Sequence, residues 1–138
     1  MADTDLALLL DRFMRRIHAA LHAKAPDFDS DRIGPGGAMV LLTLADMETA
    51  QMHELARRVA RDKSQMTRVV QALETKGMVT RKPAPQDARV SLISLTDRGH
   101  TVVATLRQVL AETIDEILGP IAEQEKRTLR DLLRRAMS

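Results

Sequence analysis

The residues best suited to chemistry lie on one side of a helix that we predict from Ser64 to Lys76. Apolar residues repeat with the spacing of a single helix face, at Met66, Val69, Val70 and Leu73. Arginine and glutamine can form paired hydrogen bonds with guanine and adenine edges in a major groove, and small residues allow close approach. This composition is typical of a DNA-reading face, and a solvated helix is the plain alternative. The outward residues are Ser64, Arg68, Gln71 and Thr75, with Gln65, Thr67 and Ala72 on the flanks.

Asp87 and Arg89 form the second candidate site, at the tip of a predicted hairpin. Residues two apart on extended backbone project to the same side, so we expect the carboxylate to hold the guanidinium in one rotamer. An arginine held in this way suits a narrow, negative minor groove, and Lys82 near the same tip would meet phosphates. The alternative is a surface ion pair that only stabilises the turn.

The elements predicted around these residues have the order of a winged helix. A short helix over His53–Ala60 precedes the Ser64–Lys76 helix, and such a pair forms a helix-turn-helix. Asp62 is expected to cap the second helix, with Gln65 completing a capping box, and Gly77 marks its left-handed end. A hairpin over residues 78–82 and 90–95, with a proline-rich loop, supplies the wing.

Four further helices are expected, and their apolar stripes indicate a homodimer. The helix at 38–47 is apolar almost all round, which predicts burial. Pro26 is expected to end the first helix, and Thr96 is expected to cap the fifth.

Leucine-rich stripes on the first, fifth and sixth helices exceed what a small winged-helix core can cover. The predicted fold class is mainly α with a small β-hairpin wing. We expect a single domain of residues 1–138, with a DNA-binding lobe at 34–95 and dimerisation helices at 1–30 and 96–138. The four helices are expected at residues 3–24, 38–47, 96–118 and 123–137.

Composition and charge narrow the class of protein. The chain has 138 residues, no cysteine and only 1% aromatic residues, which excludes disulfides and thiol chemistry and disfavours base stacking on aromatic rings. Residues 57–90 hold nine basic and three acidic side chains, a net +6, while the remaining chain carries −4. A basic middle suggests a polyanion partner. No secretory signal, membrane span, cofactor motif or catalytic grouping stands out, so we expect a cytoplasmic protein that is not an enzyme and has no cofactor.

The N-terminal helix holds less specific candidates. His18 and His22 lie four apart, a spacing compatible with a shared metal, and folding could bring Asp11 or Asp115 near them. No other ligand is obvious, so ordinary histidines and no metal are expected. A small-molecule effector site is expected at Phe13, Met14, Ile17, His18 and Met39, with core packing as the alternative for the methionines.

The chain resembles the MarR (multiple antibiotic resistance regulator) family of bacterial transcription factors over essentially its whole length. The resemblance implies a homodimer whose two lobes occupy successive major grooves of a pseudo-palindromic operator, and small anionic or phenolic ligands that often relieve repression. The matching stretches are Glu54-Leu55-Ala56-Arg57-Arg58, Lys63-Ser64-Gln65-Met66-Thr67-Arg68-Val69-Val70, Leu73-Glu74-Thr75-Lys76-Gly77-Met78-Val79, Gln86-Asp87-Ala88-Arg89 and Leu95-Thr96-Asp97-Arg98-Gly99.

By this resemblance Arg68 reads bases and Arg89, oriented by Asp87, enters the minor groove. One departure is Gln51-Met52-His53, where the family often has a serine or threonine that touches phosphate. A dimeric protein-interaction module with a degenerate winged helix is the competing function, and an activator is as compatible with the sequence as a repressor. The residues expected to contact DNA are Arg57, Lys63, Ser64, Gln65, Thr67, Arg68, Gln71, Lys82, Asp87 and Arg89.

Overall fold

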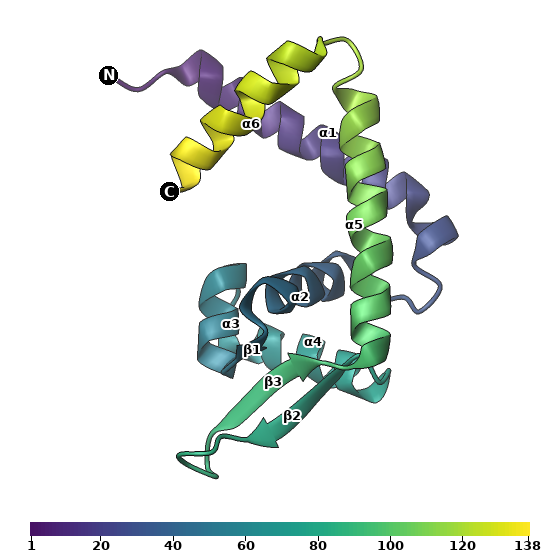
Figure 1. Cartoon of the computed structure of the whole chain (residues 1–138), viewed down its shortest axis with the longest axis vertical. Coiled ribbons are helices and arrows are strands. Elements are labelled where there is room, and N and C mark those ends of the chain that lie inside the picture. The colour runs from purple at the N-terminus through teal and green to yellow at the C-terminus, as the bar shows by residue number, and fades with distance from the viewer. The chain divides into compact units, whose positions relative to one another are not determined.

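Six helices and three strands follow one another along the chain, and the computed structural model describes all residues from 1 to 138. The chain divides into two compact units, one of residues 24–108 and one of residues 1–23 together with 109–138. The predicted class, mainly helical with a β-hairpin, is confirmed (Figure 1). The elements are α1 Thr4–Phe28, α2 Gly34–Met47, β1 Thr49–Ala50, α3 Met52–Val59, α4 Lys63–Thr75, β2 Val79–Pro83, β3 Ser91–Leu95, α5 Asp97–Ile117 and α6 Glu123–Met137.

The sheet is antiparallel, and β3 lies between β1 and β2. The predicted hairpin is confirmed: β2 pairs with β3 along its whole length, from Val79 opposite Leu95 to Pro83 opposite Ser91. Strand β1 was not predicted. It consists of two residues that pair with Ser94 and Ile93, and two residues are too few for an alternating pattern to show.

Helix α1 does not end at Pro26 as expected. It continues to Phe28, and Asp29 N still donates to Ala25 O at 2.7 Å. The prediction is wrong because Pro26 lies in the last turn, where a proline removes one backbone hydrogen bond and little helix remains beyond it to be disturbed.

Helix α2 begins at Gly34, four residues before the predicted start. Pro35 is tolerated there because the N–H groups of a first helical turn have no partner within the helix. The Asp29 carboxylate satisfies two neighbouring donors, accepting from Ile33 N at 2.9 Å and from Gly34 N at 3.0 Å. The turn before α2 is therefore fixed by one side chain.

The core of the 24–108 unit lies between α2, α3, α4 and the sheet. Four residues of α2 are buried, Gly37, Val40, Leu41 and Leu44, which confirms the predicted burial there. Met39 is 41% exposed, so the helix is not buried on every side. Side chains with no more than 1% exposure come from each of the surrounding elements: Val40, Leu41, Leu44, Ala50, Leu55, Met66, Val70, Leu73, Met78 and Ile93. These contacts fix α4 on the sheet.

The link between α4 and the wing depends on Gly77 and Thr96. Gly77 has the predicted left-handed conformation, with φ +76°, and Met78 N donates back to Leu73 O at 3.0 Å, as in a Schellman motif. The Thr96 hydroxyl donates to Gly77 O at 2.6 Å and accepts from Gly99 N at 3.1 Å. Thr96 therefore caps α5, as predicted, and joins α5 to the end of α4.

The unit of residues 1–23 and 109–138 carries large apolar side chains on its surface. No residue of α1 or α6 is buried. The exposed ones are Leu6, Leu8, Leu9, Leu10, Met14, Leu132, Leu133 and Met137, each at least 47% exposed. None of the helices combines the length and apolarity needed to cross a membrane.

Candidate nucleic-acid interface

Helix α4 turns a polar face outward, as its sequence predicts. Asp62 Oδ1 accepts from Gln65 N at 2.8 Å and so caps the helix, although the expected reciprocal bond from Asp62 N to the Gln65 side chain is not formed. Met66, Val70 and Leu73 are buried, and Val69 is half-buried. The polar residues opposite are exposed, apart from the half-buried Thr67: Lys63, Ser64, Gln65, Arg68, Gln71 and Thr75.

Helices α3 and α4 are joined by a tight turn. Ala60 ends α3 in the left-handed conformation, with φ 56°, and the extended Asp62 starts α4. Arg57 and Arg58, in the last turn of α3, are exposed. The pair has the geometry of a helix-turn-helix, with basic side chains beside the exposed face of α4.

The start of α3 has no serine or threonine cap. Gln51 is the residue before the helix, and Glu54 Oε1 accepts from its backbone N–H at 2.9 Å. The carboxylate therefore fixes the turn that a hydroxyl would otherwise fix. His53 is exposed next to it.

At the wing tip, Asp87 holds Arg89 as predicted, but by a different backbone geometry. Asp87 Oδ1 accepts from Arg89 N at 3.0 Å and from Nε at 3.1 Å, and Oδ2 accepts from Nη2 at 3.2 Å. The expected extended backbone is wrong: Val90 N donates to Asp87 O at 3.0 Å, so these residues form a turn. The bonds from Arg89 lower the pKa of Asp87, and the Arg89 side chain is 91% exposed.

A hollow of about 350 Å³ lies between the start of α3, the start of α4 and the wing. Arg81 reaches it from β2 and also pairs with Glu74 of α4, Nε to Oε1, at 3.3 Å. Sequence reasoning did not single out Arg81, because three separate segments meet here and no local pattern marks the meeting. The residues that line the hollow are Gln51, Met52, His53, Lys63, Thr67, Arg81, Val90 and Ser91.

Comparison with known proteins identifies the family. The sequence model of the MarR family matches residues 36–91. The chain is 30% identical to the PcaV transcriptional regulator from Streptomyces coelicolor, solved in complex with its natural ligand, over 99% of this chain and 97% of that one, with a TM-score of 0.68. This protein belongs to the MarR family.

This MarR-family chain is also similar to a Bacillus subtilis protein in sequence and to an E. coli protein in fold. It is 31% identical over 96 residues to YdgJ, an uncharacterized HTH-type transcriptional regulator of Bacillus subtilis; that match takes in 70% of this chain and 58% of YdgJ. The fold is also that of wild-type MarR from E. coli in its apo form, with a TM-score of 0.84, full coverage of both chains and 23% identity. The predicted resemblance and the winged-helix class are confirmed.

The predicted effector residues of this MarR-family protein lie on two different helices. Phe13, Met14, Ile17 and His18 lie on α1, in the unit of residues 1–23 and 109–138, whereas Met39 lies on α2 in the other unit. None of them lines the hollow beside α4 or the cavity between residues 28–33 and α5. The effector site at these residues stays a prediction. No three histidine, aspartate or glutamate side chains gather closely enough to hold a metal ion.

Proposed function

We propose that this MarR-family protein is a homodimeric, sequence-specific DNA-binding repressor that leaves its operator when a small-molecule effector binds. The outward face of α4 carries the proposal. Arg68 and Gln71 are exposed on a helix whose apolar side is fixed in the core, and the wing displays Arg89 on a neighbouring hairpin. A helix-turn-helix inserts such a face into the major groove.

Arg68 is the residue that we assign to base reading, with Ser64, Gln65, Thr67 and Gln71 around it. A guanidinium can make two hydrogen bonds to guanine, and an amide can do the same with adenine. Arg68 is exposed and forms no ion pair in the structure, so no rearrangement of the protein is needed before it meets a base.

Arg89 is assigned to the minor groove. Its guanidinium makes two bonds to Asp87 yet stays 91% exposed, so it is both oriented and accessible. A narrow minor groove concentrates negative potential and attracts an inserted arginine. Lys82, exposed on β2, is assigned to backbone phosphates near the same groove.

The hollow beside α4 is assigned to a backbone phosphate. Lys63 and Arg81 supply two positive charges, and the start of α3 supplies backbone N–H groups. These groups replace the serine or threonine that family members often place at the start of α3. Arg57, exposed at the other end of α3, would add a contact that does not depend on sequence.

The exposed apolar side chains of α1 and α6 are assigned to the dimer interface. Leaving Leu6, Leu9, Leu132 and Leu133 in water is unfavourable by about 25 cal/mol for each Å² of apolar surface. A two-fold axis that buries them also yields two copies of α4, which a palindromic operator requires. Because the partner is chromosomal DNA, we place the protein in the cytoplasm and assign it no catalytic activity.

Selection of bound genomic fragments tests this function. Fluorescence anisotropy should then show the selected duplex binding at least about a thousandfold more tightly than random DNA at physiological salt, with log affinity falling linearly against log salt. Arg127→Ala, which removes an exposed arginine of α6, serves as the control for a general loss of positive charge. Selected and random duplexes of equal affinity would contradict a sequence-specific repressor.

A further inference from the structure

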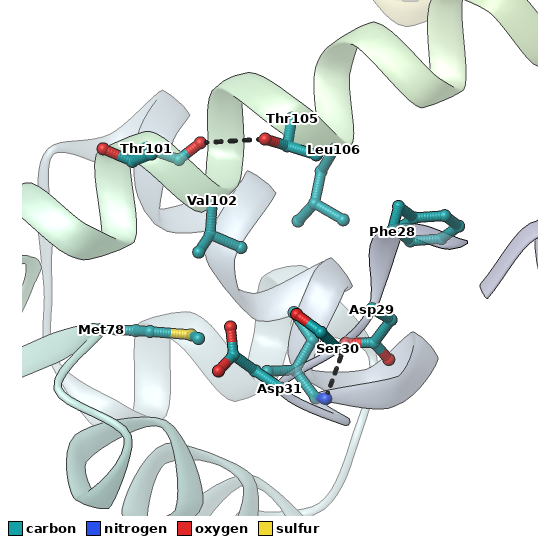
Figure 2. Close-up of a pocket in the computed structure, with 10 residues that line it drawn as sticks. Phe28, Asp29, Ser30, Asp31, Met78, Thr101, Val102, Thr105 and Leu106 are labelled. Atoms are coloured by element: carbon teal, nitrogen blue, oxygen red, sulfur yellow. Dashed lines mark hydrogen bonds between the residues drawn. The ribbon is translucent and has the colours of Figure 1, made fainter. Parts of the chain in front are cut away.

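A small cavity of about 170 Å³ lies within the 24–108 unit, between residues 28–33 and α5 (Figure 2). Phe28, Ile33, Val102 and Leu106 give it an apolar wall, together with Met78 from the end of α4. This volume is below the roughly 300–1,000 Å³ of pockets for drug-sized molecules. A ligand here has one ring or one short apolar chain.

The polar groups in the cavity are almost all hydrogen-bond acceptors. The hydroxyls of Thr101 and Thr105 donate to their own helix, to Asp97 O at 3.2 Å and to Thr101 O at 3.4 Å, which leaves only their lone pairs. Asp29 and Asp31 add two carboxylates. The only donor side chain that lines the cavity is Ser30, and no lysine, arginine or histidine lines it.

Of the two carboxylates, Asp31 is the one with room for a ligand. Both oxygens of Asp29 already accept backbone N–H groups at the start of α2. Asp31 Oδ1 accepts from Arg98 Nη2 at 2.6 Å, which leaves Oδ2 for another donor. In Figure 2 the Asp31 carboxylate points between Met78 and Val102.

We propose that this cavity binds a small organic amine, with its ammonium group on Asp31 and its apolar part against Val102 and Leu106. An ammonium group supplies three donors where the cavity supplies acceptors, and its charge matches the carboxylate. A carboxylate ligand would face two carboxylates, and Arg98, the cation bonded to Asp31, does not itself line the cavity. The chemistry of the cavity therefore selects an amine and rejects an organic acid of the same size.

The turn that lines this cavity is also bonded to the proposed DNA-reading helix. Arg32 lies between the cavity residues Asp31 and Ile33, and its carbonyl accepts from Lys76 Nζ, at the end of α4, at 3.1 Å. An amine bound at Oδ2 of Asp31 weakens the bond from Arg98 to the same carboxylate, shifts the turn and so acts on α4 through Lys76. This second step rests on the proposed repressor function, whereas binding of the amine does not.

Binding is tested on the full chain by NMR, with backbone amide shifts followed at neutral pH. Benzylamine, benzyl alcohol and benzoate are the probes, since they share one ring and differ in the polar group. Benzylamine should shift the amides of residues 28–33 and 101–106, and benzoate should leave them unchanged. Equal shifts from benzoate and benzylamine, or benzylamine shifts spread over the acidic surface, would overturn the amine site.

Two variants locate the ammonium group. Asp31→Asn should weaken benzylamine binding about tenfold, since a charged hydrogen bond is lost, while Asp27→Asn, an exposed carboxylate outside the cavity, should have no effect. Thr105→Lys adds a cation at an exposed lining position and should also weaken binding of benzylamine. Unlike Asp31→Asn, this variant leaves the bond between Asp31 and Arg98 in place. Unchanged affinity in both Asp31→Asn and Thr105→Lys would refute the assignment.

The link to α4 is tested with a selected operator duplex. Saturating benzylamine should weaken operator binding by the wild type, and Lys76→Met should bind benzylamine equally well but lose most of this response. A full response in Lys76→Met, or none in the wild type, would overturn the link. If no duplex is bound specifically, the repressor function fails, and the NMR titration still decides whether the amine site exists.

Discussion

The backbone carbonyl of Met78 lies against Gly99, so closely that a Cβ atom on residue 99 would overlap the carbonyl oxygen. The same oxygen accepts from Thr96 N at 3.0 Å. Because Met78 follows α4 and Gly99 lies in the first turn of α5, this contact joins the end of the proposed DNA-reading helix to the helix that follows the wing. The glycine of the Leu95–Gly99 motif is needed for this close approach.

Gly99→Ala should lower the free energy of unfolding by about 2–4 kcal/mol, since backbone rather than a flexible side chain must move. Gly77→Ala is the comparison. Its φ of +76° strains an alanine by about 1–2 kcal/mol, but a Cβ there meets nothing within 4 Å. Urea unfolding followed by circular dichroism measures both variants.

His100→Ala is the control for this pair, because His100 is an exposed neighbour in α5. Its free energy of unfolding should stay within about 0.5 kcal/mol of the wild type. A Gly99→Ala protein that is no less stable than Gly77→Ala would show that residue 99 has room for a side chain.

The Asp87–Arg89 pair should be visible in the titration of Asp87. The hydrogen bonds from Arg89 lower the pKa of this carboxyl in the folded protein. Asp87 therefore has a lower pKa in the folded protein than in the unfolded chain. The small stabilisation from the Asp87–Arg89 pair is fully present when the pH is above the pKa of the unfolded chain. It is lost as the pH falls through the pKa of the folded protein. Side-chain carboxyl shifts measured by NMR against pH should give a midpoint for Asp87 below that of an ordinary aspartate.

Arg89→Ala should return the Asp87 pKa toward its ordinary value. Arg89→Lys is the informative companion, because it keeps the charge and loses the two-bond contact. If the midpoint for Asp87 in Arg89→Ala is the same as in the wild type, the pair does not persist in solution.

Much of the helix-turn-helix could be predicted because its signals are local. The spacing of Met66, Val70 and Leu73 defines the buried side of α4, and Asp62 and Gly77 mark its ends. Boundaries next to prolines failed, since Pro26 is accommodated within a last helical turn and Pro35 in a first one. A regular pattern predicts the body of a helix better than its ends.

The parts of the site that were missed arise where distant segments meet. Arg81 was not predicted, and it lines one hollow with Lys63 and His53 although the three residues come from β2, α4 and α3. At the wing tip, the spacing of Asp87 and Arg89 predicted the pair, yet the bond from Arg89 N to the Asp87 side chain forms in a turn and not on extended backbone. Residue types predicted the partners, and tertiary structure decided the geometry.

Arg68→Ala and Lys63→Ala should affect DNA binding in different ways. Loss of a base contact from Arg68 should relax the preference at one operator position by about 1–3 kcal/mol. Loss of Lys63 from the hollow should weaken operator and random DNA alike and reduce the slope against log salt by about 1. Affinity measured for a set of single-base operator variants separates the two effects.

The same affinity measurements can contradict both assignments. If Arg68→Ala weakened all duplexes equally, its side chain would bind phosphate, and base reading would have to come from Gln71 or Gln65. If Lys63→Ala changed sequence preference, the hollow would not hold a backbone phosphate.

Leu133→Glu should dissociate the proposed dimer. Leu133 is 48% exposed on α6, and burial of a leucine is worth about 1.5–3 kcal/mol, which two-fold symmetry applies twice. The dimer should weaken about a hundredfold or more, so sedimentation at low micromolar concentration should detect monomers. Gln124→Glu, at an exposed polar position of the same helix, adds the same charge and should leave the dimer intact. Operator affinity should fall in Leu133→Glu and not in Gln124→Glu, because a monomer has one copy of α4 and reads only half of a palindrome. A Leu133→Glu protein that stays dimeric would show that the dimer interface does not involve Leu133 of α6.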